Sequence, residues 1–495
     1  MRDIVVGIDA STTSVKAIAF DRHGRELLQA RESYPLSNPH PGHFEQDPED
    51  WWSALLKVLR TLADGIGTDR IAAMAIAHQR ETFTLLDARG AALVPAILWL
   101  DERARPQVAR LSARFGRDQI REWTGKPPDP TPALYALAWL AEHRPEAMEK
   151  ATAVADVNAF LALRLTGRLV TATASADPLG LLDMASRQWQ PELVQAAGLR
   201  PEQMPGLVPP GSEMGRLRED VAWQTGLPSG LPLFAGAGDG QAMGLGMGVV
   251  GEGKSYLSLG SGIVGGTYSR NYVNSDAFRT LVSPSGGFML ETVLRSGMQL
   301  VEWIVRTTGG RPVAALEAES RVVAPGSGNL LVLPYWAGVM SPYWDEAARG
   351  AIFGLSLDHT PAHLFRAALE GMAFEQALAT EALEEGCGRF GGAIVAAGGG
   401  TQSALLMEIM ASALERPIAI SPVNEAAALG AAMLAAAGLG WHADVAAASL
   451  AMSAEATRQV EPTAELVDAY RARKPIYQTL YHATRNVHHR MAEIE

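Results

Sequence analysis

The chain begins with short apolar runs of alternating polarity, separated by small polar turns. Residues 5–8 and 15–20 predict two strands, and residues 25–30 predict a third strand after a turn at residues 21–24. Asp9 ends the first run, and the turn that follows it, Ser11-Thr12-Thr13-Ser14, is rich in hydroxyl groups. The N-terminal segment therefore predicts strands whose first turn gathers a carboxylate and four hydroxyl groups.

Helical and strand patterns then alternate along the first half. Residues 47–50, Asp-Pro-Glu-Asp, predict the start of a helix with acidic groups in its first turn and an apolar face. Residues 71–77 and 96–100 predict two further strands, each followed by a cluster of polar residues. Strands that lead into polar clusters and helices indicate an α/β fold, in which ligand groups lie at the ends of strands.

The second half repeats the pattern of the opening. A stretch rich in Pro and Gly, residues 201–232, precedes a new series in which residues 254–269 predict a strand, a Gly/Ser turn and another strand. No exact sequence repeat accompanies this similarity of pattern. It predicts two related halves with a cleft between them, residues 1–245 and residues 246–495.

Composition and charge limit the classes of function. The 495 residues are 47% hydrophobic and 19% charged, which predicts more than one large core, and the net charge of −12 without a basic run argues against nucleic-acid binding. Cys387 is the only cysteine, which excludes an intrachain disulfide and favours a cytoplasmic location. We expect no secretory leader, because the N-terminus lacks a charged region followed by an apolar one. We also expect no membrane span, because the apolar residues 426–441 are too few for one and predict a buried helix.

Two turns, one in each half, are candidates for phosphate binding. Backbone N–H groups and hydroxyls in a turn of small residues can approach an anion closely. Thr12, Thr13 and Ser14, followed by Lys16, would suit a polyphosphate, and Asp9 could hold Mg²⁺ through water. Ser261 and Gly262 lie in the corresponding turn of the second half. An ordinary hairpin with a polar tip is the alternative for each turn.

Four further groups are candidates for substrate or nucleotide contacts. Asp239 is flanked by small residues, so it could accept a proton from a hydroxyl that attacks phosphorus; the alternative is a helix cap. Arg80 and Glu81 directly follow a strand and suit vicinal hydroxyls, with a surface salt bridge as the alternative. Trp99 ends another strand, where it could stack on a sugar or belong to the core. Gly399 and Gly400, between a strand and a helix, permit close approach of a planar or ribosyl group.

Five segments in order resemble the FGGY family of carbohydrate kinases along the whole chain. The segments are GIDASTTSVKAIAFD, GAGDGQAMGLG, GAIFGLSLDHTPAHLFRAALEG, AAGGGTQSALLMEIMASAL and NEAAALGAAMLAA. The resemblance implies a fold of two actin-like (ribonuclease H-like) ATPase domains, with ATP and Mg²⁺ as cofactors. It further implies phosphorylation of a hydroxyl of a small sugar or polyol.

The resemblance also implies roles for individual residues. Asp239 would be the general base, and Asp9 would face the magnesium ion. Ser261 and Gly262 would contact the transferring phosphates, and Gly399 and Gly400 would line the adenosine pocket. The sugar-binding domain would be residues 1–245, and the nucleotide-binding domain residues 246–495.

The acceptor is less narrowly defined by the motifs. His78-Gln79-Arg80-Glu81-Thr82 resembles glycerol kinases, whereas Trp99-Leu100-Asp101-Glu102-Arg103-Ala104 resembles xylulokinases and suggests that Asp101 and Arg103 contact the substrate. Thr131 and Gly240 stand where glycerol kinases carry the larger Tyr and Gln, so both predict a roomier pocket. The leading interpretation is a ketopentose kinase.

Other functions remain open from the sequence alone. Within the same class, the alternatives are a glycerol kinase and a tetritol kinase. A different class is an actin-like ATPase scaffold without a sugar substrate. The sequence does not determine the oligomeric state, and a homodimer is one alternative.

Overall fold

The apolar runs at the N-terminus form one half of a six-stranded sheet. The computed structural model describes residues 2–456 and 458–494. The strands of this first sheet lie in the order β13-β14-β5-β1-β2-β3. Their bounds are β1 Ile4–Ala10, β2 Ser14–Asp21, β3 Glu26–Ser33, β5 Ile71–His78, β13 Glu213–Arg216 and β14 Pro232–Gly238.

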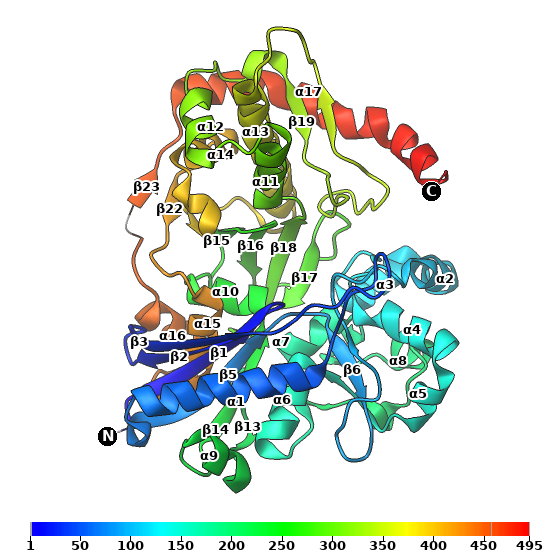
Figure 1. Cartoon of the computed structure of the whole chain (residues 1–495), viewed down its shortest axis with the longest axis vertical. Helices are drawn as coiled ribbons and strands as arrows, with labels where there is room; N and C mark the ends of the chain where they lie inside the picture. The colour runs from blue at the N-terminus through cyan, green and yellow to red at the C-terminus, as the bar shows by residue number, and fades with distance from the viewer. Residues whose placement is uncertain (1, 457, 495) are drawn as a thin grey trace.

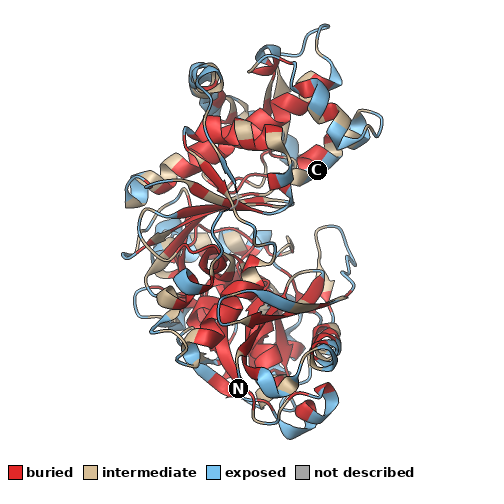
Figure 2. Cartoon of the chain, turned by 90° about the vertical axis from the view of Figure 1, so that its left-hand side faces the viewer, coloured by how far each residue is buried: buried red, intermediate tan, exposed pale blue. Residues whose placement is uncertain are grey.

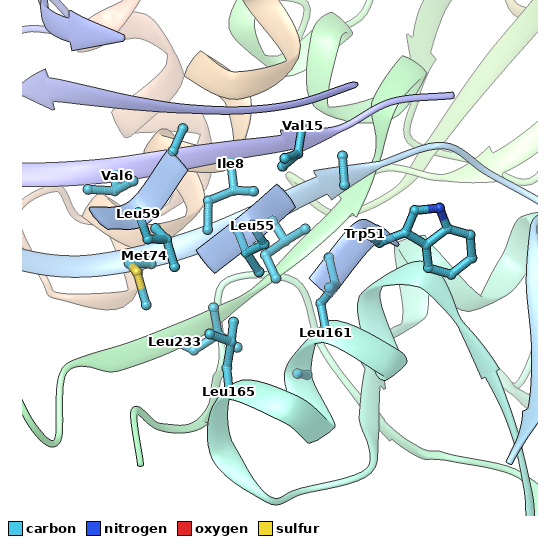
Figure 3. Close-up of a cluster of buried hydrophobic side chains, with 14 of the residues drawn as sticks. Val6, Ile8, Val15, Trp51, Leu55, Leu59, Met74, Leu161, Leu165 and Leu233 are labelled. Atoms are coloured by element: carbon cyan, nitrogen blue, oxygen red, sulfur yellow. The ribbon is translucent and has the colours of Figure 1, made fainter. Parts of the chain in front are cut away.

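Strand β1 is buried on both faces, and its alternation divides two layers of helices. Val6 and Ile8 pack with α1 (Pro48–Gly65) and α6 (Val157–Thr166), where Leu55 and Leu161 lie in the same hydrophobic cluster (Figure 3). Val5 points to the opposite face and packs with α15 (Ala426–Gly438). This is the two-residue period of a strand, with apolar side chains on both faces because helices cover both.

A second sheet of seven strands repeats the pairing of the first. Its order is β17-β18-β16-β15-β21-β22-β23. From β18 to β23 the neighbours pair antiparallel, antiparallel, parallel, parallel and antiparallel, which is also the series from β3 to β13 in the first sheet. Its strands are β15 Ser255–Leu259, β16 Ile263–Ser269, β17 Arg279–Val282, β18 Phe288–Leu294, β21 Ile394–Ala397, β22 Ile418–Ile420 and β23 Arg458–Val460.

The two sheets lie in two lobes, one above the other (Figures 1 and 2). The upper lobe adds the hairpin of β19 (Leu331–Leu333) and β20 (Ala351–Phe353). Its helices are α11 Met298–Thr307, α12 Val313–Ser320, α13 Pro361–Cys387, α14 Ala404–Leu414 and α17 Ala464–Ala492. The core of this lobe is formed by α11, α13 and α14 on the second sheet, together with tyrosines of α17.

The lower lobe carries a smaller α/β unit beside the first sheet. Its four strands, in the order β4-β7-β6-β8, are β4 Glu45–Gln46, β7 Ala96–Ile97, β6 Phe83–Leu86 and β8 Ala153–Asp156. The helices around them are α2 Arg105–Phe115, α3 Arg117–Thr124, α4 Ala133–His143, α5 Pro145–Lys150 and α8 Pro191–Ala196. Shorter elements complete the lobe: β9 Val170–Ala172, β10 Leu182–Asp183, β11 Gln188–Trp189, β12 Gly206–Val208, α7 Thr173–Ala176, α9 Glu219–Thr225 and α16 Val445–Met452.

Helices α10 (Asp239–Gly246) and α15 come from different halves of the chain and pack directly on each other. At this contact a Cβ on Gly430 would overlap the main-chain oxygen of Ala242, and a Cβ on Gly246 would overlap that of Ala426. Glycines therefore permit the close approach, which places α15, from the second half, on the first sheet (Figure 1).

The predicted α/β fold with two related halves is confirmed, and the predicted strands and the buried helix at residues 426–441 are present. The strand expected at residues 96–100 is shorter, since β7 ends at Ile97. Beyond it, the amide of Leu98 still donates a hydrogen bond to the carbonyl of Phe44. Among the described residues, none of the helices combines the length and the apolar character needed to span a membrane.

The α10–α15 contact predicts an unusual cost for a small substitution. Alanine at position 430 would normally favour a helix over glycine, but its methyl group would push α15 away from α10. We expect Gly430→Ala to lower the free energy of unfolding by ~1–3 kcal/mol, as overpacking does. Denaturant unfolding would measure this, with Gly251→Ala as control because no atom lies within 4 Å of its added Cβ. Equal stability of both variants and the wild type would contradict the close contact.

Candidate active site

The turn between β1 and β2 is tight, and some of its polar groups are already hydrogen-bonded within the protein. The amide of Ser11 donates to the carbonyl of Ser14 at 3.0 Å, which closes the turn. Thr13 is exposed, Ser14 is buried, and the hydroxyl of Thr12 accepts a hydrogen bond from the indole of Trp99 at 2.9 Å. Of the three hydroxyl residues of this turn that are predicted to bind phosphate, Thr13 is therefore the most accessible.

Asp9 and Lys16 face each other across the same hairpin. The Lys16 ammonium lies 3.9 Å from Asp9 and 2.5 Å from Glu425, which precedes α15. Burial raises the pKa of Asp9 to about 7, and the negative charges of Asp239 and Glu425 act in the same direction, while Lys16 opposes them. The turn of the first sheet, the second half of the chain and Asp239 thus share one electrostatic environment.

Asp9 has the character of a cation ligand. Within the described part of the chain, its Oδ1 is buried and has no hydrogen-bond partner. A buried carboxylate oxygen without a partner is costly, and a bound cation would satisfy it. Residues 2–456 and 458–494 contain no preformed cluster of three or more acidic, His or Cys ligands. A site with one carboxylate fits Mg²⁺, which keeps most of its waters.

Asp239 is the first residue of α10, at the carboxyl end of β14. Its Oδ1 accepts a hydrogen bond from the amide of Gly240 at 2.8 Å and lies 3.2 Å from Nε of Arg80. The side chain of Asp239 remains 39% exposed, whereas that of Arg80 is 8% exposed. A carboxylate that is held through one oxygen and remains partly exposed is suited to accept a proton from a substrate hydroxyl.

Arg80 and Glu81 follow β5, and both are buried in ion pairs. Arg80 donates to both oxygens of Glu291 at 3.0 Å, and Glu81 accepts from Arg279 at 3.0 Å. Burial raises the pKa of Glu81 to about 7 although Arg279 and Arg80 lower it. Burial lowers the pKa of Arg80, but Glu291, Glu81 and Asp239 more than reverse this. The surface salt bridge that was the alternative for this pair is wrong, because neither residue is at the surface.

The glycines beside Asp239 make room for Arg80. A Cβ on Gly238 would lie 2.6 Å from Cδ of Arg80, and a Cβ on Gly240 would lie 2.8 Å from Oε2 of Glu291. The space beside Gly240 is therefore filled by this ion pair. The expectation that Gly240 enlarges the acceptor pocket is wrong for this reason.

Trp99, Asp101 and Arg103 lie on the segment after β7. Trp99 is 37% exposed, and its contact with Thr12 places it beside the turn of the first sheet. Asp101 and Arg103 are paired with each other, through Nε at 2.8 Å and Nη2 at 2.8 Å, and Arg103 also donates to Glu45 at 2.8 Å. The charges of Asp101 and Arg103 are thus paired with each other, whereas the partly exposed ring of Trp99 is accessible to a ligand.

Thr131 takes part in a contact between the two lobes. Its amide donates to Asp129 at 2.9 Å, and Arg295, which follows β18 of the second sheet, lies 3.3 Å from Asp129 and 3.4 Å from the Thr131 hydroxyl. A second ion pair, between Arg105 and Glu346 at 2.8 Å, also joins the lobes. These two ion pairs thus link the lobes, and Thr131 contacts one of them.

The loops predicted to bind nucleotide come together on the second sheet. Ser261 and Gly262 form the turn between β15 and β16, and Gly399 and Gly400 follow β21, which pairs with β15. Ser261 is exposed, and no atom lies within 4 Å of a Cβ built on Gly399, so both are accessible. Gly400 is buried against Leu259, and a Cβ there would lie 2.8 Å from that side chain.

Several charged residues of the site were missed from the sequence: Glu291, Arg279, Arg295 and Glu425. Glu291 carried a usable signal, since it is a lone carboxylate within the apolar run Phe-Met-Leu-Glu-Thr-Val-Leu of β18. A charge in a buried strand requires a partner. Which partner it has depends on how the two lobes meet, which the sequence does not display.

The geometry agrees with what comparison with known proteins finds. The model of the FGGY family of carbohydrate kinases, N-terminal domain, matches residues 4–246, and that of the C-terminal domain matches residues 255–439. The chain is 32% identical to a xylulose kinase of Escherichia coli K12, over 82% of this chain and 84% of that protein. It is also 32% identical to a glycerol kinase of Alkalilimnicola ehrlichii, over 92% and 94%.

The fold is shared with solved structures. A xylulose kinase from Brucella ovis superposes with a TM-score of 0.91 at 29% identity, over 98% of this chain and all of that one. With two family models that together cover most of the chain, the assignment rests on both lobes. The chain belongs to the FGGY family of carbohydrate kinases.

Proposed function

We propose that this protein is a cytoplasmic kinase that transfers the γ-phosphate of ATP to a hydroxyl of a ketopentose. The single observation that carries the mechanism is the carboxylate of Asp239, which Arg80 and Gly240 contact on Oδ1 alone and whose side chain remains 39% exposed. Membership in a family of carbohydrate kinases favours this function over an ATPase scaffold without a sugar.

Asp239 is the proposed general base. Both contacts that hold it fall on Oδ1, so Oδ2 is left to accept the proton of the attacking hydroxyl. The hydroxyl oxygen then bonds to the γ-phosphorus while the bond from phosphorus to ADP breaks. Because the transition state of phosphoryl transfer is loose, orientation of the hydroxyl matters as much as removal of its proton.

The nucleotide side is proposed on the turns of the two sheets. Thr12 and Thr13 of one turn, with Ser261 and Gly262 of the other, would bind phosphates through backbone and hydroxyl donors, and Gly399 with Gly400 would adjoin the adenosine. Ser14 would act through its backbone, because its side chain is buried. Lys16 would hold Asp9 and Glu425 in place. Mg²⁺ bound near Asp9 would neutralise phosphate charge.

The acceptor side is proposed on the lower lobe. Trp99 would lie against the carbons of the sugar, and Arg80 and Glu81 would border the site from their buried pairs, while Asp101 and Arg103 would shape its wall. We assign residues 1–245 to sugar binding and residues 246–495 to nucleotide binding. This division is supported by the limits of the two family models and qualified by α15, which packs on the first sheet.

A ketopentose is favoured over glycerol by two observations. Thr131 is smaller than the Tyr of glycerol kinases, and the xylulose kinase of Brucella ovis superposes along nearly the whole chain. The second candidate is a glycerol or tetritol kinase, which is favoured by the segment His78-Gln79-Arg80-Glu81-Thr82 and by the relative from Alkalilimnicola ehrlichii.

The first prediction of the proposed function concerns the base. Asp239→Asn keeps the size of the side chain but cannot take a proton, so we expect kcat to fall by about 10²–10⁴-fold. Steady-state kinetics with a coupled ADP assay would measure it, and thermal melting would serve as the control. A lowered melting temperature with kcat retained would favour a helix cap and reject the base.

The second prediction concerns the magnesium site. Asp9→Asn removes the carboxylate charge at the phosphate turn, and we expect a loss in kcat on the order of 100-fold, as for other single electrostatic stabilisers. Asp118→Asn is the matched control, because Asp118 is an exposed carboxylate on α3. Near-normal turnover of folded Asp9→Asn at saturating Mg²⁺ would contradict the assignment.

The third prediction concerns the acceptor. In a panel of ketopentoses, erythritol and glycerol, we expect a ketopentose to show the highest kcat/KM, about 10–200-fold above glycerol, the range for one poorly matched apolar contact. Thr131→Tyr should then reduce kcat/KM for the ketopentose more than for glycerol. Highest activity on glycerol in the wild type would instead support the second candidate.

A further inference from the structure

A chain of alternating charges runs from Asp239 in the lower lobe into the upper lobe and back. It passes from Asp239 to Arg80, Glu291, Arg279 and Glu81, with successive N–O distances of 3.2, 3.0, 2.7 and 3.0 Å. The first and second members belong to the lower lobe, and Glu291 and Arg279 lie on β18 and β17 of the second sheet. The charges on the two sheets are therefore joined through one buried path.

Glu291 is the central member of this chain. It is fully buried, and both of its oxygens accept from Nη1 of Arg80 at 3.0 Å. Its Oε1 also accepts from Nε of Arg279 at 2.9 Å, and the hydroxyl of Tyr256 lies 3.4 Å from Oε2. These contacts fix the carboxylate from several directions and leave the Arg80 guanidinium little freedom.

Arg80 in turn has its position set by the glycines around Asp239. Gly238 and Gly240 leave the room into which Arg80 and Glu291 fit, as the Cβ distances above indicate. Buried ion pairs are a weak source of stability, because desolvation offsets much of their attraction. Their geometry is more informative: this pair presents Nε of Arg80 to Oδ1 of Asp239, which leaves Oδ2 for the proposed substrate.

We propose that Glu291 is a positioning residue for Asp239, acting through Arg80. This inference rests on the proposed function of Asp239 as base. Without the negative charge of Glu291, Arg80 and Arg279 would be neighbouring cations with one anion fewer between them, and Arg80 would move. Asp239 would lose the contact that sets its orientation, although no group that touches the substrate had changed.

A neutral isostere at position 291 tests this role. We expect Glu291→Gln to lower kcat by about 10–100-fold, the size expected for a small misplacement of a catalytic group, with the KM for ATP near the wild-type value. Glu370→Gln is the matched control, since Glu370 is equally buried and accepts from Arg366 at 2.9 Å within the upper lobe. The control should lose stability and keep kcat. An equal loss of kcat in both variants would overturn the proposal.

A double-mutant cycle separates this role from a merely structural one. If Glu291 acts through the base, Glu291→Gln should add less than about twofold to the loss already caused by Asp239→Asn, because residues that act as a unit are not additive. Full additivity would overturn the proposal. If Glu291→Gln does not fold, Glu291→Asp replaces it. Its shorter side chain withdraws the carboxylate from Arg80, so we expect a lowered kcat, and a kcat within about twofold of wild type would overturn the role.

The same experiment distinguishes failure of the proposed base from failure of the proposed role of Glu291. If Asp239→Asn alone retains kcat, the proposed base fails. If Asp239→Asn loses kcat while Glu291→Gln retains it, the base stands and only the role of Glu291 fails.

Discussion

The buried guanidinium of Arg80 is the point on which the site depends. It follows the central strand β5 of the first sheet, touches Asp239 at the start of α10, and pairs with Glu291 of the second sheet. A single side chain thus links two lobes and the proposed base. Because a guanidinium offers several donors in a rigid plane, it can make these contacts together, which a lysine could not do in the same way.

The close packing of α10 on α15 complements this link. Main-chain atoms of the two helices approach at Gly246 and Gly430, where any side chain would separate them. This contact between halves of the chain brings Glu425, just before α15, to the hairpin that carries Asp9 and Lys16. The glycines of α10 and α15 therefore affect the charged site, because they set how closely the two halves of the chain approach each other.

The sequence predicted much of the fold because its signals are local. Alternating apolar residues gave β1 and β2, the apolar residues 426–441 gave a buried helix, and the repeated strand–turn–strand pattern matched the duplicated sheet pairing. The strand at residues 96–100 was overestimated, because an apolar run does not report where its hydrogen bonds end. The roles of the proposed site residues stay predictions, and the structure adds which of them are accessible and which are already paired.

The sequence by itself determined the α/β class, the family and the short motifs, because each depends on residues that are neighbours along the chain. Only the tertiary structure decided what surrounds Asp239. The glycines beside it suggested room for a substrate, yet that room holds Arg80 and Glu291. These two partners are 211 residues apart in the chain. Their pairing arises from the docking of one lobe against the other, and a contact between distant residues leaves no periodic mark in the sequence.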